Sequence, residues 1–148
     1  MNVLAAAGAG FLLAVLWFDL MFDVQIRRSD EAARKAALGS ISAYYRRVTT
    51  EARPMNSLVP AMMFITLGAI GLEAMQASRP WWIVWPSLAL AASAIGLAMV
   101  RTVGKAVRLG TAKDTTDVQL RLARIVYQDH VYCFAAIAGL IVLQLLPL

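Results

Sequence analysis

The residues of this 148-residue sequence that could carry chemistry are a few ionisable side chains set within long apolar stretches. Asp19 and Asp23 are four residues apart, so on a helix they share one face. His130, the only histidine, lies at the start of a later apolar stretch. An ionisable group at membrane depth is costly, and it is the default place to look for function. Two carboxylates and an imidazole could bind a divalent metal ion or relay protons.

These residues allow two interpretations. In the first, Asp19, Asp23 and His130 surround one inward-facing polar site, and Asn56 joins it from the start of the second apolar stretch. In the second, each aspartate pairs with an arginine at the headgroup level, because basic residues flank both stretches. The candidate partners are Arg53, Arg101 and Arg124. No possible ligands have the spacing of a recognised zinc or iron motif, so we predict no metal site and assign no cofactor. Asp129 is expected to face water.

A stretch rich in arginine and tyrosine precedes the second apolar stretch and is a separate candidate site. Arginine and tyrosine near a cytoplasmic interface can bind an anionic lipid headgroup or an anionic substrate. They also serve as simple anchors at the interface, and the sequence leaves both roles open. The candidate contacts are Tyr44, Tyr45, Arg46, Arg47 and Arg53.

Glu73 lies near the far end of the second apolar stretch. We expect its side chain to extend to the outer surface and to meet Arg79, the one basic residue of the connection that follows. The alternative is a cavity beneath Glu73, because the helix stripe below it is mildly polar.

Four apolar stretches must position these side chains. The chain is 60% hydrophobic and 16% charged, whereas soluble domains are about 45–50% apolar and about 25% charged. Lipid is therefore the second solvent, and about 20 helical residues cross a hydrocarbon core of roughly 30 Å. The predicted spans are residues 3–23, 56–76, 81–101 and 126–146. We predict an all-α, polytopic membrane protein, residues 1–148, whose four transmembrane helices form one up-down bundle with cytoplasmic helical extensions.

Basic residues predict the orientation of this bundle. Of the 14 Lys and Arg residues, seven lie between the first and second spans, six lie from the end of the third span to the fourth, and the last is Arg79. The positive-inside rule places the two basic connections in the cytoplasm and both termini outside an inner membrane. The net charge of +5 thus reflects topology and contact with anionic membrane lipids, and we expect no nucleic-acid partner.

The first cytoplasmic connection, residues 29–53, is expected to be helical. Ser29 is a suitable N-cap, because it is followed by acidic residues. Gly39 is the expected end of that helix.

The second cytoplasmic connection, residues 102–125, is expected to form a helical hairpin that projects inward. Thr116 and Gln119 have the spacing of a capping box, so the fourth helix should begin well before its apolar stretch.

Small residues spaced by four allow close contact between helices. They occur in Ala6–Gly10–Ala14, Ala92–Gly96 and Ala135–Gly139. The leading hypothesis is therefore an accessory or scaffold subunit that forms a homo-oligomer or joins a larger membrane complex. The alternative is a membrane enzyme or binding protein for a lipid-soluble or anionic small molecule, with its polar site at the inner leaflet. A proton-coupled transporter would need a polar path from the aspartates to Glu73, and the intervening stretches are apolar.

The layout resembles two groups of small four-helix membrane proteins. One is the membrane-associated eicosanoid and glutathione metabolism family, whose second helix opens with a motif of Arg, Asn, Glu and Pro. Asn56 and Pro60 fit that motif, but Arg53 is one residue out and Val59 stands in place of the Glu, so glutathione binding is not carried over. The span order, with a histidine in the last helix, also resembles small bacterial membrane proteins of the anthrone-oxygenase-like class.

Overall fold

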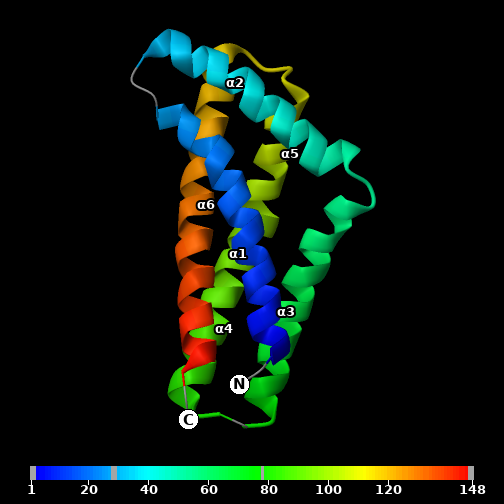
Figure 1. Cartoon of the computed structure of the whole chain (residues 1–148), viewed down its shortest axis with the longest axis vertical. Coiled ribbons are helices and arrows are strands. Elements are labelled where there is room, and N and C mark those ends of the chain that lie inside the picture. The colour runs from blue at the N-terminus through cyan, green and yellow to red at the C-terminus, as the bar shows by residue number, and fades with distance from the viewer. Residues whose placement is uncertain (1–2, 28–29, 78, 147–148) are drawn as a thin grey trace.

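The computed structural model describes residues 3–27, 30–77 and 79–146, and every regular element in these ranges is helical (Figure 1). Four helical segments are long and apolar enough to cross a membrane: Val3–Arg27, Leu58–Met75, Trp81–Thr111 and Thr116–Leu145. The prediction of an all-α chain with four such helices is confirmed at this level.

The long helices form a ring in which each packs against two neighbours. α1 (Val3–Asp23) contacts α3 (Leu58–Met75) and α6 (Thr116–Leu145), and α4 (Trp81–Leu97) contacts the same two helices. Neighbours in the ring run in opposite directions, so the first turn of α1 and the last turn of α6 lie at the same end (Figure 1). α4 continues through the π-helical segment Ala98–Thr102 into α5 (Val103–Thr111).

The outer face of this ring is strongly apolar. Large hydrophobic side chains such as Trp17, Phe64 and Val100 are 57%, 62% and 90% exposed. A soluble protein rarely leaves so many large apolar groups in contact with water. The helices are apolar on all sides because one face meets the core and the other suits hydrocarbon.

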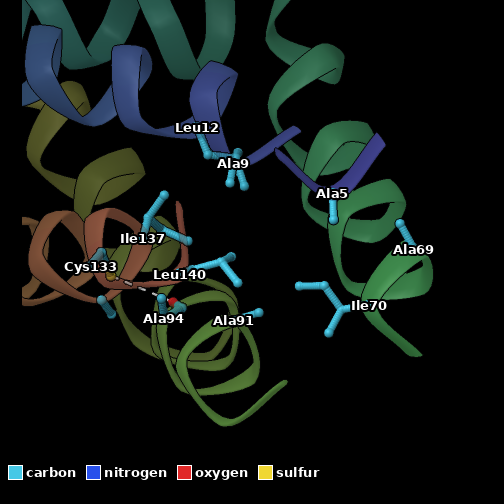
Figure 2. Close-up of a cluster of buried hydrophobic side chains, with 11 residues drawn as sticks. Ala5, Ala9, Leu12, Ala69, Ile70, Ala91, Ala94, Cys133, Ile137 and Leu140 are labelled. Carbon is cyan, nitrogen blue, oxygen red and sulfur yellow. Dashed lines mark hydrogen bonds between the residues drawn. The ribbon is translucent and has the colours of Figure 1, made fainter. Parts of the chain in front are cut away.

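The core of the ring is built from small and branched side chains that converge from all four helices (Figure 2). Gly8 marks the closest approach, since a Cβ placed there would collide with the Thr66 hydroxyl oxygen of α3. The contact face of α1 therefore runs through Gly8. Of the predicted contact stripe Ala6–Gly10–Ala14, Gly10 and Ala14 face away from this core.

A second core lies where α2 (Glu31–Arg46) crosses one end of the ring (Figure 1). Ile41 and Leu109 are fully buried there. A Cβ at Gly110 would lie 2.7 Å from the backbone nitrogen of Arg46, so glycine is required where α5 passes under α2. We call α2, α5 and the first turns of α6 the cap.

Details of the cap differ from the sequence predictions. Asp30, whose carboxylate accepts from the Ala32 and Ala33 backbone N–H groups, is the N-cap of α2, and Ser29 lies outside the described residues. Gly39 does not end α2, because packing against α5 and α6 carries the helix on to Arg46.

α6 begins at Thr116, well before its apolar stretch, as predicted, but its cap differs from the prediction. Thr115 is the N-cap and makes no side-chain capping bond. The Gln119 side chain is buried and its amide has no hydrogen-bond partner, so the predicted capping box does not form.

Candidate functional site

Five polar side chains meet where α1, α2 and α6 come together beneath the cap. We call them the cap-end cluster: Asp19, Asp23, Tyr44, Tyr45 and His130. α1 supplies both aspartates from one face of its last two turns, as the spacing of four predicts. α2 brings the two tyrosines across the end of the ring, and α6 brings the histidine.

The imidazole of His130 lies between the two carboxylates. Its Nδ1 is 2.7 Å from Asp23 Oδ2, and its Nε2 is 3.9 Å from Asp19 Oδ2. An ionised carboxylate only accepts hydrogen bonds, so with Asp23 ionised the proton on Nδ1 points to Asp23. Nε2 is then directed toward Asp19, across a distance too long for a direct hydrogen bond.

Each tyrosine donates a hydrogen bond to one of the two carboxylates. The Tyr44 hydroxyl donates to Asp19 Oδ1 at 2.7 Å, and the Tyr45 hydroxyl donates to Asp23 Oδ1 at 2.7 Å. Burial, reinforced by the nearby carboxylates, raises the pKa of both phenols well above the ordinary value. Both hydroxyls therefore keep their protons and act as donors. Phe22 stacks on the Tyr44 ring at a centroid distance of 4.1 Å and fixes its orientation.

The cluster is enclosed at one end and more open at the other. Asp23 and Tyr45 are 1% and 2% exposed. The Asp19 side chain is 13% exposed, against 0% for Asp23. Asp19 is thus the more accessible of the two carboxylates.

No arginine neutralises these carboxylates in the part of the chain that the structure describes. Their only ion pairs are with His130. Arg101 pairs instead with Asp129 at 3.1 Å, and the Thr102 hydroxyl donates to the same carboxylate at 3.2 Å. The expectation that Asp129 faces water is wrong, because this residue lies on the face of α6 that packs against Ala98–Thr102.

Asn56 lies outside the cluster. Its amide donates to the Thr49 carbonyl at 3.2 Å and braces the connection between α2 and α3. The arginine- and tyrosine-rich stretch does not form one site either. Arg46 pairs with Glu51 at 3.2 Å, and Arg47 and Arg53 are exposed, while both tyrosines of the stretch bind the aspartates.

A second polar cluster is buried at the opposite end of the ring. We call it the terminus-end cluster: Glu73, Arg79, Ser87 and Gln144. Glu73 and Arg79 were expected to meet at the outer surface; they do meet, with Arg79 Nε 3.8 Å from Glu73 Oε1, but both are buried. The Arg79 guanidinium donates to the backbone carbonyls of Gln144 and Leu146 at 3.2 and 2.8 Å.

Gln144 links this second cluster together. Its amide donates to Glu73 at 3.2 Å and to the Ser87 hydroxyl at 3.3 Å, so one side chain joins α3, α4 and α6. Sequence analysis did not include it among the site residues, although it is the single polar interruption of the last apolar stretch. That interruption is the signal by which it could have been found.

Within residues 3–27, 30–77 and 79–146, no group of three or more His, Cys, Asp or Glu side chains is arranged to hold a metal ion. The chemistry that the cap-end cluster can perform with its own side chains is proton transfer and hydrogen bonding.

The fold and the cap-end cluster together define a small helical protein with four helices suited to a membrane and a buried carboxylate–imidazole–tyrosine site. No family model, curated protein or solved structure matches the chain.

Proposed function

We propose that the cap-end cluster is an acid–base site that binds a lipid-soluble small molecule and exchanges protons with it. The chain would then be a membrane enzyme or binding protein, with its site at the inner leaflet. The observation that carries this proposal is the buried contact between Asp23 and His130 Nδ1, which leaves Nε2 directed toward the more open Asp19.

The arrangement suits proton exchange for a physical reason. A carboxylate bonded to one imidazole nitrogen fixes the tautomer and orientation of the ring, and the other nitrogen is then poised as a base or an acid. The 3.9 Å between Nε2 and Asp19 can be bridged by a hydroxyl or an amine of a ligand.

The charge of the cluster selects the ligand. When both carboxylates are ionised, the cluster carries net negative charge even with the ring protonated, so an anionic ligand would be repelled. The side chains of Trp17 and Phe18, next to Asp19 on α1, are 57% and 60% exposed on the outer face of the ring. This neighbourhood favours a neutral or cationic molecule that arrives through lipid.

The proposed topology places the cap in the cytoplasm and both termini outside an inner membrane. Thirteen of the 14 basic residues lie on the cap side of the apolar stretches or at their cap-side ends, and the positive-inside rule puts that side in the cytoplasm. A reporter fused after Leu148 tests this directly: activity of a periplasm-dependent reporter is expected, and activity of a cytoplasm-dependent one would overturn the topology.

The single histidine makes a sharp test of the site possible. In full-length chain labelled with ¹⁵N-histidine and held in lipid nanodiscs, every imidazole signal comes from His130. We expect a short-chain ubiquinol, a membrane-soluble phenol or a tertiary amine to shift the Nε2 signal saturably. Asp19→Asn should weaken this response, and the exposed Arg121→Gln should leave it unchanged. If none of these probes moves the signal, the proposal fails.

A second candidate is an accessory or scaffold subunit that oligomerises or joins a larger membrane complex. The outward orientation of Gly10 and Ala14 on α1 favours it, because small residues on a lipid-facing surface permit close helix contact between chains. In-membrane crosslinking through a cysteine at Gly10 is the test. Recovery of the monomer alone would count against this candidate.

A further inference from the structure

A second feature of the cap, separate from the cap-end cluster, is a cavity of about 340 Å³ lined by arginines from three elements. Arg27 comes from the short helix after α1, Arg34 from α2 and Arg124 from α6. The other lining residues are Ile26, Tyr127 and Gln128. None of the three arginines belongs to the arginine- and tyrosine-rich stretch discussed above.

The three arginines give this cavity a positive charge that no ion pair of the described residues neutralises, and the Glu31 carboxylate interacts with Arg34 at longer range. No carboxylate lines it, and none of the three arginines forms an ion pair in the described part of the chain. Arg27 Nη1 makes only a long hydrogen bond of 3.4 Å to the Tyr127 hydroxyl. Like charges that converge without an anion repel one another, so the cavity is suited to an anionic group.

One nitrogen in the cavity wall lacks a partner. Arg34 Nε is buried and has no hydrogen-bond partner within the described ranges. A buried donor without an acceptor is costly, and it leaves the Arg34 guanidinium with hydrogen-bonding capacity that the described residues do not use. Guanidinium groups bind phosphate in a planar, two-bond geometry, which makes phosphate the best-matched anion.

The depth of the cavity relative to the membrane indicates whether the phosphate would belong to a lipid headgroup. On α6, Gln128 and Arg124 precede Val131, where the apolar stretch begins, by three and seven residues. At 1.5 Å per residue, Gln128 lies about 4.5 Å and Arg124 about 10.5 Å beyond the hydrocarbon. The headgroup layer on each side of a bilayer is roughly 5 to 8 Å thick. When α6 spans a bilayer, Gln128 therefore lies within the headgroup layer, and Arg124 lies just beyond it, where its long side chain can reach a lipid phosphate.

We propose that Arg27, Arg34 and Arg124 form a specific site for the phosphate of an anionic phospholipid of the inner leaflet. Tyr127 and Gln128 offer further hydrogen bonds to the headgroup. The site is independent of the acid–base function proposed for the cap-end cluster, so either can fail without the other.

Native mass spectrometry of the full-length chain in detergent tests the site with three probes. These are dioctanoyl phosphatidylglycerol, dioctanoyl phosphatidylcholine and inorganic phosphate. We expect the anionic lipid to bind at least about fivefold more tightly than the zwitterionic one, as for one basic contact near a membrane surface. Equal binding of the two lipids overturns the proposal. If equimolar inorganic phosphate displaces the anionic lipid, the site binds phosphate itself, and the proposal that its ligand is a lipid is overturned.

Three variants separate a built site from general attraction to positive charge. Arg34→Gln and Arg124→Gln should each weaken binding of phosphatidylglycerol about fivefold. Arg121→Gln removes an exposed arginine one turn away on α6 that does not line the cavity, and should leave binding unchanged. An equal loss in Arg121→Gln overturns the proposal. Arg124 is exposed, so its substitution keeps the test valid even where Arg34→Gln impairs folding.

Discussion

The two buried polar clusters of this protein lie at opposite ends of the same four-helix ring, and they differ in the kind of charge they hold. At the terminus end, Arg79 lies beside Glu73 and donates to two backbone carbonyls, so a cation and an anion offset each other. At the cap end, two carboxylates meet one imidazole, and no arginine of the described residues forms an ion pair with them. One end places a carboxylate beside a cation that keeps its charge, whereas the other places its carboxylates beside an imidazole, which is charged only when it holds a second proton.

This difference indicates that the terminus-end cluster is structural, whereas the cap-end cluster can take part in proton transfer. Arginine does not lose its proton in proteins, so the cation of the terminus-end cluster is permanent, and the cluster acts as a clamp that joins α3, α4 and α6. Histidine changes charge near physiological pH, so the cap-end cluster can accept and release protons. Burial alone does not distinguish the two, because Asp23 and Glu73 are both buried.

The largest effect is expected from breaking the clamp. Arg79→Ala leaves Glu73 buried without its cation, and removal of one partner from a buried pair costs about 3–5 kcal/mol. Thermal unfolding in detergent should report this loss. Arg121→Ala, an exposed position, should change stability by less than about 0.5 kcal/mol. A loss in Arg79→Ala no larger than in this control would refute the clamp.

A smaller loss is expected where α5 passes under α2. Gly110→Ala places a methyl group 2.7 Å from the Arg46 backbone, which should cost about 1–3 kcal/mol by overpacking. Gly39→Ala is the matched change: nothing lies within 4 Å of the added carbon, so better helix propensity should stabilise α2 by about 0.5–1 kcal/mol. Chemical or thermal unfolding measures both changes in the free energy of unfolding. If both substitutions stabilise the protein, or both destabilise it, the described packing is contradicted.

The proton-dependent end should also respond to alkaline pH. The pKa of Tyr45 is raised above its ordinary value of about 10, so its contribution to stability is complete below pH 10 and is lost as pH rises further. Tyr45→Phe should cost about 1–3 kcal/mol at pH 7, since Asp23 loses a buried donor.

The same substitution should flatten the fall in stability above pH 10. Unfolding of wild type and Tyr45→Phe between pH 7 and pH 11 measures both effects. Identical slopes in the two proteins would show that the Tyr45 phenol does not carry the pH dependence.

Part of the candidate site could be predicted from sequence. Asp19 and Asp23 share a face because a helix repeats every 3.6 residues, and His130 begins an apolar stretch at a similar depth. The role of Tyr45 could not be predicted, since it joins Asp23 across 22 residues only because α2 turns back over the end of the ring. Asn56 was expected in the site for its depth, but its amide bonds to the Thr49 carbonyl of the connection between α2 and α3.

The amino-acid sequence by itself determined the four long apolar helices and the basic connections between them, because hydropathy and charge act locally along the chain. Tertiary structure alone decided which polar groups are paired. His130 meets Asp23 across 107 residues, and Gln144 meets Glu73 across 71, through the order in which the helices pack around the ring. A buried polar group takes the partner that packing brings within hydrogen-bond distance, and that distance is not written in the spacing of residues along one helix.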